Sequence, residues 1–130
     1  MKTNIGQKMY NLGYELLNTR FGNGEGGVGV IRTTDDTYYT SVWNETINSA
    51  VDLCAETGAI LEAHKYNKTV THSMCIVRNE NGSIDILSPC GVCQERLFFW
   101  GAEVMCAVTN PKNKIIFKKL KELQPFYWKK

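Results

Sequence analysis

Pro89-Cys90-Gly91-Val92-Cys93, together with Cys54-Ala55-Glu56 earlier in the chain, places the strongest constraint on fold and chemistry. The two segments supply three potential thiolate ligands and one carboxylate. Zinc held by three protein ligands keeps its fourth tetrahedral position open for water, and a nearby Glu can move protons on and off that water. The sequence therefore predicts one catalytic Zn²⁺ per subunit, with Glu56 as catalytic residue and three cysteine ligands: Cys54, Cys90 and Cys93.

Each segment is predicted to open a helix. Residues 54–63 are mostly helix formers, so Cys54 and Glu56 are expected in a first helical turn. Pro89 suits the start of a second helix because its missing N–H costs little there, and residues 94–100 continue that helix. Two helix N-termini directed at one metal place positive partial charge beside the thiols, which lowers their pKa values and favours metal binding.

Strands and helices alternate along the rest of the chain. Apolar residues at helical spacing predict an amphipathic helix from about residue 5 to residue 20. Residues 28–34 and 38–42 are expected to form a β-hairpin. Further extended segments are predicted at 73–78, 84–87, 104–109 and 114–117. This alternation predicts a central sheet covered on both faces, with its site at the ends of strands and the starts of helices.

Length and composition limit the possible classes of protein. With 130 residues and 43% hydrophobic content, one compact domain over residues 1–130 is expected. A net charge of +2 favours neither nucleic acid nor an anionic membrane as partner, and no apolar run is as long as a transmembrane helix. Five cysteines and a polar N-terminus argue against a secreted disulfide scaffold and favour a cytoplasmic location. Cys75 and Cys106 lie in apolar segments and are expected to be buried.

A Cys followed two residues later by Glu, and then Pro-Cys-x-x-Cys, is the signature of the zinc nucleobase deaminases. On these residues the chain resembles the cytidine deaminase family, and within it the small all-cysteine members that include cytidine deaminases and blasticidin S deaminases. Residues 28–33, 87–93 and 120–125 resemble the family's first strand, second metal motif and C-terminal stretch. The resemblance implies an α/β fold, namely a three-layer α/β/α sandwich around a central mixed five-stranded sheet.

The same resemblance implies a hydrolytic deaminase. Its substrate would be cytidine, deoxycytidine or a cytosine nucleoside antibiotic such as blasticidin S, converted to the uracil form with release of ammonia. Glu56 would take a proton from water, deliver it to N3 of the cytosine ring and assist the departure of ammonia. The family also implies a cytoplasmic homotetramer whose partner is a small molecule rather than nucleic acid or a membrane.

Substrate contacts are inferred from the resemblance alone. Glu45 occupies the position of the Glu that holds the ribose in the family, while Trp43 replaces the family's Asn and Asn44 lies beside it. The Ala55 backbone and the Ser88 carbonyl correspond to groups that contact the base. Trp128 belongs to an aromatic C-terminal stretch that resembles the tail of blasticidin S deaminases, which reaches the active-site region. Packing of this tail against the domain or a neighbouring subunit is the alternative.

Two further departures from the family pattern concern Gly26 and Thr57. Gly26 stands where an aromatic residue usually precedes the first strand. Thr57 takes the place of an Arg that offsets thiolate charge in many all-cysteine members. Some blasticidin S deaminases lack the same features, so these departures favour that branch.

Two other functions fit parts of the sequence. A deaminase of another base or of single-stranded nucleic acid would use the lysines that gather near the C-terminus as a groove for the backbone. A non-catalytic structural zinc protein would need a fourth ligand, for which Cys75, His64 or His72 are the candidates.

Overall fold

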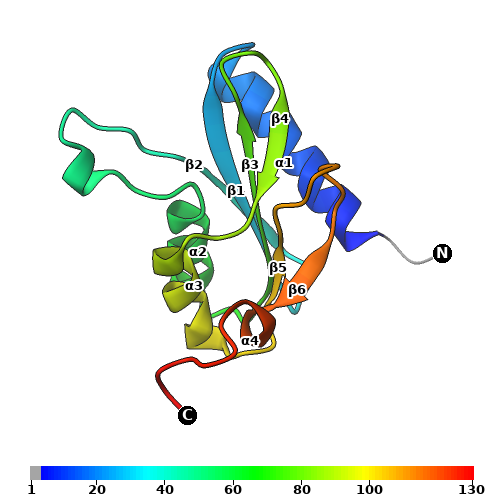
Figure 1. Ribbon diagram of the computed structural model, residues 1–130, viewed down its shortest axis with the longest axis vertical. Helices are drawn as coiled ribbons and strands as arrows, with labels where there is room; N and C mark the ends of the chain where they lie inside the picture. Colours follow the sequence, from blue (N-terminus) through cyan, green and yellow to red (C-terminus); the bar gives the residue numbers. More distant parts are fainter. Residues whose placement is uncertain (1–3) are drawn as a thin grey trace.

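The computed structural model describes residues 4–130 and contains a central sheet with helices on both faces (Figure 1). The helices are α1 (Ile5–Phe21), α2 (Thr57–Lys65), α3 (Gly91–Leu97) and α4 (Leu120–Leu123), with 3₁₀ turns η1 (Ser49–Val51) and η2 (Phe98–Trp100). The strands are β1 (Gly26–Thr33), β2 (Tyr38–Val42), β3 (Val70–Arg78), β4 (Ile84–Leu87), β5 (Met105–Ala107) and β6 (Phe117–Lys119).

Five strands follow the order β2-β1-β3-β5-β6. Among the strands of residues 4–130, only β3 and β5 pair in parallel. The other pairings are antiparallel, so the sheet is mixed as expected. The sheet has six strands rather than five because β4 returns along β3 through the turn at residues 79–83. That turn closes with a hydrogen bond from the Asn79 amide to the Ser83 carbonyl, 2.8 Å long. The α/β class is confirmed.

Alternation along β1 divides the core between the two faces of the sheet. Val28 and Val30 are fully buried in a cluster that includes Met9 and Leu17 of α1. Ile31, one residue on, is buried in a second cluster with side chains of α2 and α3: Ala59, Ile60, Ala63 and Leu97. Because successive strand residues point to opposite faces, both helical layers are held by the same strand. The three layers predicted from the sequence are present (Figure 1).

The segment between β2 and α2 extends away from the three layers before the chain returns to α2 (Figure 1). It contains η1, and its apolar side chains Ile47 and Val51 are exposed. None of the helices in the described part of the chain has the length and apolar character needed to cross a membrane.

Candidate metal centre and active site

Three cysteines from two separate segments meet beside the ends of α2 and α3. The Sγ atoms of Cys54, Cys90 and Cys93 all lie within 4.8 Å of one another, and those of Cys54 and Cys90 are 3.4 Å apart. Thiolates around a tetrahedral zinc at about 2.3 Å are about 3.8 Å apart, so the triad matches the size of a zinc site. The structure thus brings together the ligands proposed from the sequence.

The helix starts differ from the expected ones. α2 begins at Thr57, so Glu56 is its N-cap and Cys54 lies in the preceding turn. The Cys54 carbonyl accepts a 3.0 Å hydrogen bond from the Thr57 amide. α3 begins at Gly91 with Cys90 as its N-cap, in an extended backbone with ψ of 169°, so Pro89 lies before the helix and not in its first turn. Helix ends fray, so a local sequence pattern carries little information about the exact first residue of a helix.

The three thiols differ in their electrostatic surroundings, and the lowered pKa expected for all of them is found only for Cys90. Burial raises the pKa of Cys54. Partial burial opposes ionisation of Cys90, but the backbone amides of Cys93 and Val92 and the Cys54 thiol together lower the pKa of Cys90. Burial raises the pKa of Cys93, and the Glu56 carboxylate raises it further. Metal binding displaces protons from such thiols, so metal affinity increases with pH.

Glu56 is almost fully buried next to the cysteines, with 3% of its surface exposed. Burial raises the pKa of Glu56, although its own backbone amide, Cys93 and the charge of Arg96 act in the opposite direction. A carboxyl group with a raised pKa holds a proton more readily than an ordinary carboxyl group and can release it to a bound molecule. The arrangement suits a group that both accepts and donates a proton.

Arg96 is a site residue that the sequence reasoning missed. Its Nη1 donates a 3.0 Å hydrogen bond to Oγ1 of the buried Thr57, which ties α3 to the start of α2. Arg96 therefore places a positive charge at the start of α2, where it opposes the larger effect of burial, which raises the pKa of Glu56. Arg96 lies three residues after Cys93, so the shared helix face was the available signal.

A cavity of about 170 Å³ opens beside the cysteines and Glu56. Three predicted substrate contacts line it: Trp43, Ala55 and Ser88. The Trp43 amide donates to the Gly27 carbonyl at 2.8 Å, which extends the pairing of β2 with β1 and places Trp43 at the cavity wall. The remaining wall residues are Gly27, Cys75, Val77 and Leu87.

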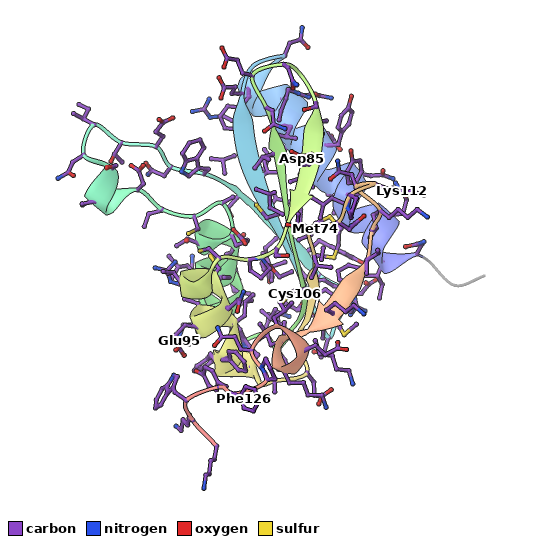
Figure 2. The ribbon with its side chains drawn as sticks, viewed as in Figure 1. Met74, Asp85, Glu95, Cys106, Lys112 and Phe126 are labelled. Carbon is purple, nitrogen blue, oxygen red and sulfur yellow. The ribbon has the colours of Figure 1, made fainter. Side chains whose placement is uncertain are left out.

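The other predicted contacts lie outside this cavity. Asn44 pairs with Leu53 through two backbone hydrogen bonds of 3.1 Å, and Glu45 beside it is exposed. The Trp128 indole donates to Glu95 of α3 at 2.8 Å, and Tyr127 stacks on Phe98 with ring centroids 3.7 Å apart. Figure 2 shows Glu95 and Phe126 at the same end of the molecule. Tyr127 and Trp128 of the tail thus contact their own domain, whereas Phe126 is exposed.

The candidate fourth ligands do not join the triad. Within residues 4–130 the three cysteines are the only group of His, Cys, Asp or Glu gathered closely enough to hold a metal. Cys75 is buried in the cavity wall, His64 packs edge-on against Phe99, and His72 is within 2.8 Å of the Thr71 hydroxyl. A three-cysteine set leaves one tetrahedral position for a reacting molecule.

Gly29 on β1 sets how closely the Glu56 turn approaches the sheet. An added Cβ would lie 2.5 Å from the Glu56 Cα and 2.7 Å from the Ala55 carbonyl oxygen. Both are backbone atoms, so the turn would have to move. We expect Gly29→Ala to lower the free energy of unfolding by about 1–3 kcal/mol and to reduce metal affinity, measured by urea unfolding and zinc titration.

Gly91→Ala is the matched control, because its added methyl group would meet no atom within 4 Å. Equal stability and equal zinc affinity in the wild-type and Gly29→Ala proteins would contradict the close approach.

Comparison with known proteins adds an independent observation. Among solved structures, the cytidine deaminase from Bacillus anthracis has a TM-score of 0.92 and 57% sequence identity, over 96% of this chain and 90% of that chain. The cytidine deaminase from Mycobacterium leprae has a TM-score of 0.74 and 20% identity, over 95% of this chain and 99% of that chain. That of Burkholderia pseudomallei has a TM-score of 0.73 and 14% identity, over 94% of this chain and 98% of that chain.

The second and third similarities concern the fold alone, because their identities are low. No protein-family model matches the chain, and none of the curated proteins matches it.

Proposed function

This chain belongs to the cytidine deaminase family, and from that premise we propose that it is a zinc-dependent hydrolase of a free cytosine nucleoside or a cytosine nucleoside antibiotic. Cytidine, deoxycytidine and blasticidin S are the candidate substrates. The observation that carries the proposal is the cysteine triad next to buried Glu56, with Cys54, Cys90 and Glu56 in the wall of one cavity.

The reaction consumes water, breaks the bond between C4 and the amino nitrogen, and forms a bond between C4 and oxygen. Zinc held by Cys54, Cys90 and Cys93 would supply a nucleophile at neutral pH by lowering the pKa of water. Glu56 accepts the proton released by water and passes it to ring N3. It then takes the proton of the new C4 hydroxyl and gives it to the amino nitrogen, which leaves as ammonia while the C4 carbonyl forms. Its burial and raised pKa support both roles.

The size of the cavity supports binding of the cytosine ring inside it, with the sugar or antibiotic substituent outside. A cavity of about 150 Å³ holds a benzene molecule, so a cavity of about 170 Å³ has room for one pyrimidine ring. The sugar or antibiotic side chain would then extend past Trp43, whose side chain is 41% exposed, toward Asn44 and Glu45. Replacement of the family's Asn by Trp43 favours a substituent other than an ordinary ribose.

Ser88 supports recognition of the base through the orientation of its polar groups. Its amide and hydroxyl both bond with Thr109, each at 2.9 Å. The Ser88 carbonyl remains as the acceptor that we assign to the amino group of cytosine. The Ala55 backbone is the second assigned contact.

The test is ultraviolet-monitored deamination by purified, zinc-loaded protein. Cytidine, deoxycytidine, cytosine and blasticidin S are compared, with Glu56→Gln measured alongside. Turnover of one nucleoside compound that is lost in the variant would support the proposal and identify the branch. Turnover of none of the four by protein with one zinc per chain would contradict it.

A homotetramer in the cytoplasm is the assembly and location that we propose. Several apolar side chains are exposed and available to a neighbouring subunit: Ile47, Val51, Phe99, Phe126 and Trp128. The five cysteines are free thiols, which suits a reducing compartment. Light scattering should give four times the chain mass, and a monomeric mass would contradict this assembly.

Binding of polynucleotide is less well supported. Lys119 and Lys121 both pair with Glu103, at 2.8 Å and 2.7 Å, which offsets part of the positive charge near the C-terminus. We therefore propose a small-molecule substrate rather than nucleic acid.

A further inference from the structure

Glu56 has two roles that conflict, because it is the N-cap of α2 and also the proposed proton carrier. Glu56 is the N-cap of α2, yet its side chain makes no capping hydrogen bond. An N-cap side chain ordinarily accepts a hydrogen bond from the amide of the second or third helical residue. A carboxylate held in this way would be fixed on the helix amides. Such a carboxylate would be less able to carry protons to a substrate.

Ser41 on β2 supplies the missing cap from another part of the chain. Its Oγ accepts a 2.9 Å hydrogen bond from the amide of Ala59, the third residue of α2. The same hydroxyl donates a 2.6 Å hydrogen bond to the Ala55 carbonyl. A serine hydroxyl offers one donor and two acceptor positions, so both bonds form together. Ser41 thus holds the peptide group just before Glu56 and an otherwise unpaired helix amide.

The packing around Ser41 shows why β2 can approach α2 so closely. A Cβ on Gly58 would lie 2.7 Å from the Ser41 Cβ, so only glycine leaves room for this contact. On the side facing β1, Gly29 allows the backbone of the same turn to approach the sheet. The turn that carries Glu56 is therefore fixed by two neighbouring strands.

We propose that Ser41 is a positioning residue for the deaminase reaction: it caps α2 in place of Glu56 and so leaves the Glu56 carboxylate free to transfer protons. This inference rests on the proposed function. Without the Ser41 hydroxyl, the Glu56 carboxylate turns back to the Ala59 amide and occupies the capping position itself.

The kinetic test compares Ser41→Ala with the wild-type protein, both with one zinc per chain. We expect kcat to fall by about 10- to 100-fold with KM changed less than about twofold, because the proton carrier is misplaced while the base still binds. Thr40→Ala is the matched control, since it removes a hydroxyl from the exposed neighbouring position of the same strand. An unchanged kcat in Ser41→Ala, or an equal loss in Thr40→Ala, would overturn the proposal.

A crystal structure of zinc-loaded Ser41→Ala tests the same inference without any substrate. We expect a Glu56 carboxylate oxygen within hydrogen-bonding distance of the Ala59 amide. An unmoved carboxylate would overturn the proposal, even if the wild-type protein acted on none of the cytosine compounds. If Ser41→Ala does not fold, hydrogen exchange in the wild-type protein decides: the Ala59 amide should be protected, and rapid exchange there would overturn the cap.

Discussion

Glu56→Gln is expected to lower turnover of the cytosine compound by about 10²- to 10⁴-fold while the protein keeps its zinc and its fold. The side chain is 3% exposed and close in size to glutamine, so the substitution should leave the surrounding packing unchanged. A carboxamide does not exchange protons as a carboxyl group does. Both proton transfers assigned to Glu56 are therefore lost together.

The measurement combines kcat, zinc content by elemental analysis and thermal unfolding. Glu62→Gln is the matched control, because it makes the same chemical change on the exposed face of α2. Activity of Glu56→Gln within a few-fold of that of Glu62→Gln would exclude Glu56 as the proton carrier.

Cys90→Ala is expected to abolish stoichiometric zinc binding and, with it, turnover. Changes to groups that only support a metal ligand already cost about 10- to 100-fold in affinity, so loss of a ligand should cost more than about 10²-fold. Cys90 is exposed and makes no capping hydrogen bond through its side chain. Replacement of Cys90 by Ala removes few packing contacts, so a lower stability of the variant would be due to the loss of bound zinc.

Cys75→Ala tests whether the metal has three cysteine ligands or a fourth ligand from Cys75. Cys75 lies in the wall of the same cavity but outside the group of three cysteines. The variant should retain one zinc per chain by elemental analysis, and Co²⁺-loaded protein should keep its thiolate absorption. Loss of zinc in Cys75→Ala with retention in Cys90→Ala would contradict the three-cysteine site.

The fold was predictable wherever a local pattern repeats along the chain. The apolar spacing expected for a helix over residues 5–20 corresponds to α1, which runs from Ile5 to Phe21. The hairpin of β1 and β2 was also predicted. The extended segment predicted at residues 84–87 is β4. Only the count of five strands, which the family resemblance implied, was wrong, because β4 pairs with β3 and adds a sixth strand.

Contacts between distant residues account for what the sequence reasoning missed at the site. Ser41 bonds with Ala55 across 14 positions, and Arg96 bonds with Thr57 across 39 positions. Neither sequence separation corresponds to a helical or strand periodicity from which the hydrogen bond could be predicted. Each depends on how closely two elements approach, and Gly58 illustrates this because an added Cβ there would strike Ser41.

The sequence by itself determined the α/β class, the family resemblance and the residues proposed for metal binding and proton transfer, because reactive side chains at set spacings on helix starts are encoded locally. Only the tertiary structure decided that Glu56 is the N-cap of α2 but makes no capping hydrogen bond with its carboxylate. It also decided that Ser41 and Arg96 form hydrogen bonds with the first turn of α2, and that Trp128 bonds with Glu95 of α3. Those features depend on three-dimensional distances between elements, which packing of the whole chain sets.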